Sequence, residues 1–148
     1  MSTFKFKLAR RVHVAVHSAE SPSDDEWEAY LDDIRHWLGF VDGIFSYTVG
    51  GGPSSRQRDR AVQFWRAQSK QPPIAVVTPS VLVVRMAGAL RWFMPSQIKA
   101  FTPRDIDRAF EYLHLAAAER SAVETTLRAL AEEQGLGGFD REARLRPG

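Results

Sequence analysis

The sequence predicts an α/β fold: a mixed, mostly parallel sheet of four to five strands, layered by helices and followed by a long C-terminal helix. Segments rich in β-branched and aromatic residues alternate with segments of helical periodicity, an order that favours parallel strands joined by right-handed crossovers. The N-terminal segment has the pattern of a hairpin, which would make the sheet mixed. The chain has 148 residues, 44% hydrophobic and 26% charged, a composition typical of a domain with its own core.

Composition also narrows the classes of function. The chain contains no cysteine, which excludes disulfides, thiolate metal sites and cysteine nucleophiles. A net charge of +2 gives little reason to expect a nucleic-acid partner. The N-terminus lacks the apolar core of a signal peptide, and no apolar run is long enough to span a bilayer, so we expect a cytoplasmic protein with no membrane partner.

The first β segment runs from Phe4 to Val16, where apolar residues occupy most even positions. This alternation is typical of a half-buried strand, and the length of the segment favours a hairpin that turns near Arg10. His13 and His17 then fall on the polar face, where we expect exposed histidines. Their spacing, with no acidic third ligand, argues against a metal site, and no cofactor is expected.

Helix signals follow at several points. Ser23 and Glu26 form a capping box that starts a helix ending near Gly39, and Ser54 and Gln57 form a second one. Another helix is expected from Ser80. The expected buried positions of the three helices are, in order, Trp27, Tyr30, Leu31, Ile34, Trp37 and Leu38; Ala61, Phe64, Trp65 and Gln68; and Val83, Met86, Ala87 and Leu90.

Three further segments have strand character. Gly43 to Val49 is rich in aromatic and β-branched residues and leads directly into a glycine-rich loop. Ile74 to Thr78 is a short apolar run bounded by prolines, which suits a central strand, and Ile98 to Phe101 is expected to be the last strand.

Helical propensity then continues from Pro103 to Gln134. A continuous helix of this length would be roughly 45 Å long, so its second half must bend back, project, or meet another chain. Val123, Leu127 and Leu130 belong to a narrow apolar seam that could either pair with a second copy or fold back on the domain. We therefore expect a domain over 1–115, a helical extension over 116–134 and a flexible tail over 135–148.

The candidate binding site is the loop that enters the second helix. Gly50, Gly51 and Gly52 would allow close approach to the backbone, and Ser54 or Ser55 would stand at a helix N-terminus, which favours anions. Arg56, Arg58 and Arg60 could add charge-assisted contacts. The alternative is a simple turn with an N-cap, and the loop has neither a Walker A nor a G-x-G-x-x-G pattern.

The order of elements over residues 4 to 115, with the loop Gly50 to Ser55 entering a helix, resembles the STAS family of anti-sigma-factor antagonists and their SpoIIAA-like relatives. The resemblance implies a non-enzymatic regulatory or assembly module that docks on a partner protein, such as a kinase-like or signalling regulator. It also implies that Ser54 or Ser55 is a phosphoacceptor.

Two questions remain open in the sequence. Trp65 and Trp92 could belong to the core or to an interface that includes the glycine loop. The alternative function is a domain that binds a small ligand, a nucleotide or a lipid, and a pocket between the glycine loop and the helix from Ser80 would favour it. Catalysis would need His36 or His114 within reach of Ser54.

Overall fold

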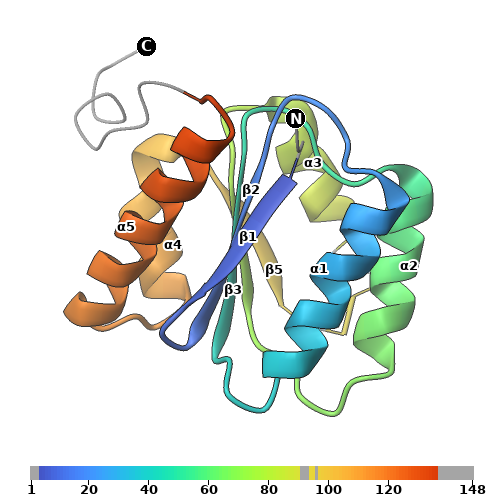
Figure 1. The fold of residues 1–148 in the computed structure, drawn as a ribbon, viewed down its shortest axis with the longest axis horizontal. Coiled ribbons are helices and arrows are strands. Elements are labelled where there is room, and N and C mark those ends of the chain that lie inside the picture. The colour runs from blue at the N-terminus through green and yellow to red at the C-terminus, as the bar shows by residue number, and fades with distance from the viewer. Residues whose placement is uncertain (1–3, 91–93, 96, 137–148) are drawn as a thin grey trace.

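The computed structural model describes residues 4–90, 94–95 and 97–136, in which helices cover both faces of one sheet (Figure 1). The sheet has five strands: β1 (Phe4–Ala9), β2 (Val12–His17), β3 (Gly43–Thr48), β4 (Ile74–Val77) and β5 (Ile98–Phe101). The helices are α1 (Asp24–Trp37), α2 (Ser55–Arg66), α3 (Val81–Leu90), a short 3-10 turn η1 (Pro103–Asp105), α4 (Ile106–Tyr112) and α5 (Ala117–Glu133).

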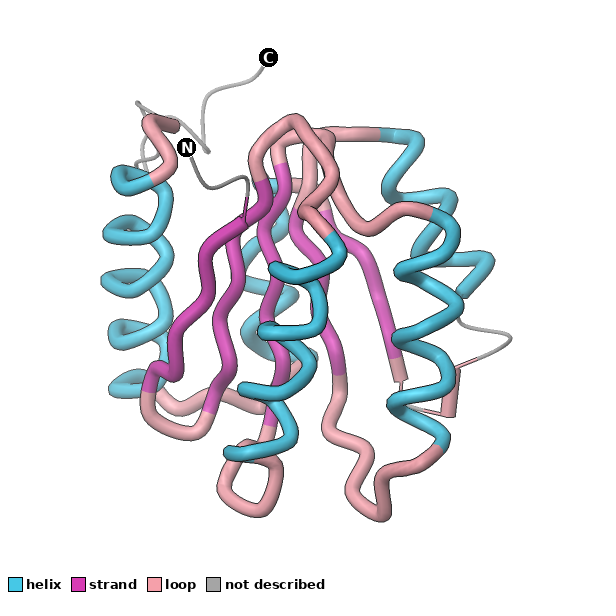
Figure 2. The backbone as a smooth tube through the Cα atoms, turned by 45° about the vertical axis from the view of Figure 1, so that its right-hand side comes forward, coloured by secondary structure: helices cyan, strands magenta, loops and turns pink. Residues whose placement is uncertain are grey.

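The strands lie in sequence order, β1-β2-β3-β4-β5, with β1 antiparallel to β2 and the remaining pairs parallel. This confirms the predicted mixed, mostly parallel sheet. Because each right-handed crossover steps to the next strand in the same direction, α1, α2 and α3 share one face. Figure 2 shows the strands between two sets of helices, and α4 and α5 form the second set.

The N-terminal hairpin turns at Arg10, whose φ of 52° is left-handed, as the sequence predicted. Its register pairs Phe4 with His17 and Ala9 with Val12. Even positions of β1 and odd positions of β2 therefore share the α1 side of the sheet, whereas Val12 and the other valines of β2 face α5. Both faces of β2 are buried, so the expected half-buried strand is wrong for β2.

His13 and His17 are buried, not exposed as predicted, because α1 lies over their face of the sheet. The Nε2 of His13 lies 2.7 Å from a carboxylate oxygen of Asp33, a residue of α1. The ring of His17 stacks on Phe4 with centroids 4.2 Å apart. These contacts make both histidines part of the core between β2 and α1.

Both predicted capping boxes are present, and they start α1 and α2. Trp27 and Ile34 of α1 are buried as expected. Trp37 is 37% exposed, although the periodicity placed it in the buried stripe. It is the last residue of α1, and its ring contacts that of His36 with centroids 4.8 Å apart, whereas the next residue, Leu38, is buried.

The segment of helical propensity over 103–134 is divided into α4 and α5, so its second half bends back, which is one of the three alternatives that the sequence left open. The chain leaves helical geometry after α4, and His114 has a φ of 57°. The amide of Leu115 donates to the carbonyl of Phe110, and the amide of Ala116 donates to Glu119, which starts α5. A left-handed residue between two apolar helices lets α5 turn back alongside α4 (Figure 1).

The seam of α5 is consequently part of the core. Val123, Leu127 and Leu130 are buried in one cluster with the valines of β2 and with α4. They therefore fold back on the domain, the second of the two alternatives that the sequence left open, and α5 shares its core with β2 and α4. Beyond α5, Leu136 packs against the same cluster, and residues 137–148 of the predicted tail lie outside the described residues.

Candidate functional site

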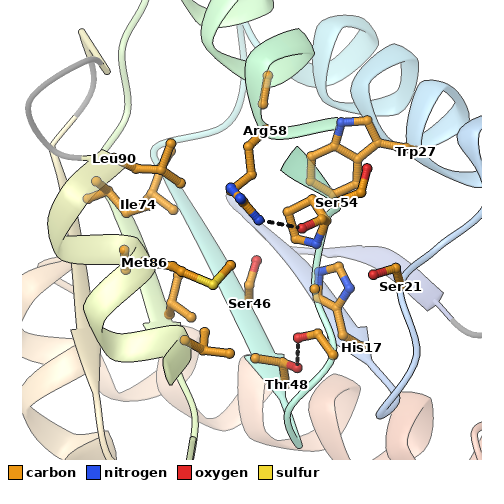
Figure 3. Close-up of a pocket in the computed structure, with 18 of the residues that line it drawn as sticks. His17, Ser21, Trp27, Ser46, Thr48, Ser54, Arg58, Ile74, Met86 and Leu90 are labelled. Atoms are coloured by element: carbon orange, nitrogen blue, oxygen red, sulfur yellow. Dashed lines mark hydrogen bonds between the residues drawn. The ribbon is translucent and has the colours of Figure 1, made fainter. Parts of the chain in front are cut away.

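A cavity of about 370 Å³ lies between the sheet and the three helices of its first face. Its walls come from α1, α2 and α3, its floor from β2 to β5, and the glycine loop forms part of its rim (Figure 3). Most of the lining is apolar: Trp27, Leu31, Ile44, Ala61, Trp65, Ile74, Val76, Leu82, Val83, Met86, Ala87, Leu90, Met94 and Ile98.

Two of the three side chains of β3 that face the cavity are small. Ile44, Ser46 and Thr48 alternate along the strand and line the cavity, while Phe45 and Tyr47 fill the core on the opposite face. Ser46 occupies the middle of the strand, where a larger apolar residue would fill the space under α3. The two faces of β3 thus differ in side-chain volume, and the face with small residues leaves the opening.

Arg58 on the first turns of α2 points into this space. Figure 3 shows its guanidinium between Ile74 and Leu90 on one side and Ser54 on the other. Its Nη1 donates to the carbonyl of Pro53 at 3.0 Å. Among the described residues no carboxylate forms an ion pair with Arg58. A half-buried cation therefore faces an apolar cavity with a single neutral acceptor.

The glycine loop is held by the chain itself. The amide of Gly51 donates to the carbonyl of Ser18 at 3.1 Å, and the amide of Gly50 donates to Oγ1 of Thr48 at 3.1 Å. Thr48 in turn donates to the carbonyl of Gly51. Two of the three glycine amides are thus already hydrogen-bonded, which leaves Gly52 for a guest.

The predicted site residues separate into a cavity group and an outer group. Ser54 and Arg58 line the cavity, together with the three glycines. Ser55 and Arg56 are exposed and do not line the cavity, and Arg60 pairs with Glu28 at 2.8 Å. The loop and the helix therefore contribute to one site, but not through every arginine that the sequence singled out.

Trp65 is 3% exposed and forms part of the cavity wall, so of the two alternatives that the sequence left open it belongs to the core. It lies on the inward side of α2, where its ring contacts Phe64 edge-on at 5.1 Å between centroids. Trp92, the second predicted interface residue, lies outside the described residues.

A network of hydrogen bonds around Gln57 joins α1 to α2. In the sequence, the capping box of Ser54 and Gln57 was the only feature that pointed to Gln57. The indole Nε1 of Trp27 donates to the backbone carbonyl of Gln57 at 3.0 Å. The amide side chain of Gln57 donates to the carbonyl of Pro22 at 2.8 Å and to Asp24 at 3.0 Å. These bonds fix two walls of the cavity relative to each other.

The remaining titratable groups of the lining are neutral near pH 7. Burial lowers the pKa of His17 to about 3, and burial raises the pKa of Tyr30 to about 12, although the side chain of Ser46 acts in the opposite direction on Tyr30. Among the lining residues that the structure describes, Arg58 therefore carries the only permanent charge. An anion entering the cavity would meet Arg58 with no competing carboxylate on the lining.

The two histidines that catalysis at Ser54 would need do not lie beside it. His36 packs on Trp37 at the C-terminal end of α1, and His114 lies between α4 and α5, so both are at the end of the sheet away from Ser54. Within 4–90, 94–95 and 97–136, no group of three or more His, Asp or Glu side chains is arranged to hold a metal ion. Over the same residues, no helix combines the length and apolarity needed to cross a membrane.

Comparisons with protein-family models, with curated proteins and with solved structures find no match. The resemblance to the STAS family thus stays a prediction, since it depends on the order of elements and the glycine loop.

Proposed function

We propose that the chain binds a small amphipathic molecule in the cavity beneath α3, with the apolar part against the sheet and a negatively charged end at Arg58. The volume of about 370 Å³ is within the range of ligand pockets, which are mostly apolar with a few placed polar groups. The lining has this composition: hydroxyl groups such as those of Ser46, Thr48 and Ser54 lie among aliphatic and aromatic side chains.

The observation that carries the proposal is the guanidinium of Arg58 inside an apolar wall. A charge in such surroundings is costly unless it is paired, and the carbonyl of Pro53 neutralises none of it. A carboxylate or similar anion would supply the missing charge through two parallel hydrogen bonds. The N-terminus of α2 opens on the same rim, and its dipole also favours a negative group there.

A lipid-like ligand fits this site better than a nucleotide. Binding of several phosphates requires free backbone amides, and Gly50 and Gly51 have already used theirs. The lining also offers one permanent positive charge, which matches a single anionic group. The long apolar wall formed by α3, including Met86 and Leu90, suits a hydrocarbon chain.

Calorimetric titration with decanoate and with decanol tests the proposal, because the two molecules share the chain and differ in charge. We expect saturable binding of both and tighter binding of decanoate. Arg58→Met should weaken decanoate binding by roughly ten- to a hundredfold, the worth of a charge-assisted hydrogen bond, with decanol unchanged. Arg56→Met removes an exposed arginine of the same helix and should leave both affinities unaltered. Equal loss in both variants, or no binding by the parent chain, would refute the proposal.

The regulatory function implied by the STAS resemblance stays a prediction. Its accessible elements are Gly50, Ser55 and Arg56, which are exposed, whereas Gly51 is buried and the hydroxyl of Ser54 is occupied by the cap. A phosphate on Ser55 would stand on the first residue of α2 without breaking the cap. Intact-mass measurement after incubation with cellular kinases tests this prediction, and an unmodified Ser55 would count against it.

A further inference from the structure

The outward face of α3 has an unusual composition. Its exposed residues follow helical spacing and are Val81, Leu82, Arg85, Gly88 and Ala89. Val81 and Leu82 are each 67% exposed, the highest values among the large apolar side chains that the structure describes. The inward face of α3 is apolar as well, because it lines the cavity with Met86, Ala87 and Leu90.

The neighbouring α2 shows what an ordinary outer face looks like in this molecule. Its outward positions are all polar: Ser55, Arg56, Asp59, Gln63 and Arg66. A surface helix normally has one apolar stripe toward the core and a charged or polar face toward water. Since the outer face of α3 is apolar except for Arg85, it is suited to a largely apolar partner.

The charge on this face indicates the kind of partner. Arg85 is exposed at the centre of the outer face, and α3 contains no acidic residue. Aliphatic side chains around the exposed Arg85, with no acid on the helix, match the surface of a bilayer that contains anionic lipid.

The outer face is also continuous with the cavity. Leu82 is exposed to solvent and at the same time lines the opening beneath α3. We propose that the outer face of α3 docks on an anionic lipid bilayer and so places the mouth of the cavity at the lipid surface. An amphipathic ligand could then pass between bilayer and cavity along Leu82 without full exposure to water. The docking itself needs no ligand, so it does not depend on the proposed function, and it departs from the expectation of no membrane partner.

Vesicle flotation tests the docking face. The parent chain should float with phosphatidylcholine vesicles that contain phosphatidylglycerol and less well with phosphatidylcholine alone. Combining Val81→Ser with Leu82→Ser should lower vesicle affinity about tenfold or more, since both aliphatic contacts are lost. Phe40→Ser is the matched control, because Phe40 is 45% exposed but follows the C-terminal end of α1, away from α3. Decanoate titration in vesicle-free solution separates this test from that of the cavity.

A second measurement covers the case in which the double variant is unstable. The chain has no cysteine, so Ala89→Cys can carry a single environment-sensitive fluorophore on the outer face of α3, with Gln63→Cys on α2 as control. Anionic vesicles should shift the emission at position 89 and not at 63. Equal emission shifts at the two positions would overturn the proposal, and so would a parent chain that does not float. A third contradicting result is a parent chain that binds no vesicles but forms a dimer that the double variant dissociates.

Discussion

The backbone amide of Gly51 donates to the carbonyl of Ser18 at 3.1 Å, and this bond joins the glycine loop to the segment that follows β2. A Cβ at Gly51 would collide with the same oxygen and would lie 2.6 Å from the carbonyl oxygen of Glu20. The middle glycine of the loop is thus required by a close approach of two backbone segments. The loop is a fixed part of the cavity rim.

Gly51→Ala should therefore be strongly destabilising. The added methyl meets backbone on the facing segment, which cannot move aside as a flexible side chain would, so we expect a loss of about 2 kcal/mol or more in the free energy of unfolding. Denaturant unfolding measures it. Gly52→Ala is the matched control, because no atom lies within 4 Å of the position that its methyl group would take. Comparable losses for the two variants would contradict the role given to Gly51.

Ser54→Ala should lower stability by about 1 kcal/mol, the usual value of an N-cap side chain. Its hydroxyl accepts from the amide of Gln57 at 3.2 Å, and that amide has no other helical partner. Ser55→Ala should change stability little, because Ser55 is exposed on the first turn. Thermal unfolding of both variants at one pH gives the comparison, and a greater loss for Ser55→Ala would refute the cap assignment.

Acid should destabilise the chain through His17. Burial lowers its pKa to about 3 in the folded state, against about 6.5 in the unfolded chain, so below pH 6.5 the unfolded state binds more protons. The contribution of His17 to the free energy of unfolding is fully present above pH 6.5. As the pH falls toward 3, this contribution declines by at most about 1.4 kcal/mol per pH unit. His13, whose pKa burial also lowers, contributes in the same direction.

His17→Phe should keep the stacking on Phe4 and remove this proton uptake. Denaturant unfolding from pH 7 to pH 4 should then show a shallower decline in stability than in the parent chain. His36→Gln, which removes a histidine at an exposed position of α1, is the control variant. An unchanged slope in His17→Phe would show that His17 is not the group responsible.

Leu127→Ala should destabilise the fold by about 2–5 kcal/mol, because Leu127 is fully buried between α5 and the sheet. The oligomeric state should not change, since the side chain faces the chain's own core. Equilibrium unfolding together with light scattering measures both quantities. A change in mass at little cost in stability would restore the intermolecular seam that the sequence left open.

The sequence predicted most of the layered architecture, because local signals determine it. Capping boxes at Ser23 and Ser54, short β-branched runs and the turn at Arg10 act within a few residues, and each appears where predicted. The sequence left open whether the second half of the segment over 103–134 bends back, and it did not locate the break between α4 and α5. The break depends on a left-handed His114 and on the burial of Leu127 against β2, and both are set by tertiary packing, not by helix propensity.

The site was predicted only in part, for a similar reason. The glycine loop, Ser54 and Arg58 were identified locally, and the alternative of a pocket between that loop and the helix from Ser80 agrees with the position of the cavity. The burial of His13, His17 and Trp65 depends on which helices cover which face. A small polar residue in the middle of an apolar strand, Ser46, was the available signal for an opening in the core.

The central claim is that an amphipathic anion occupies the cavity beneath α3, and methyl NMR of the methionines tests it most directly. The chain has three methionines, of which Met86 and Met94 line the cavity. Titration with decanoate should move the methyl resonance of Met86, assigned with Met86→Leu, along a saturable curve that Arg58→Met shifts to higher concentration. If decanoate leaves the resonances of Met86 and Met94 in place while it binds elsewhere on the chain, the cavity is not the ligand site.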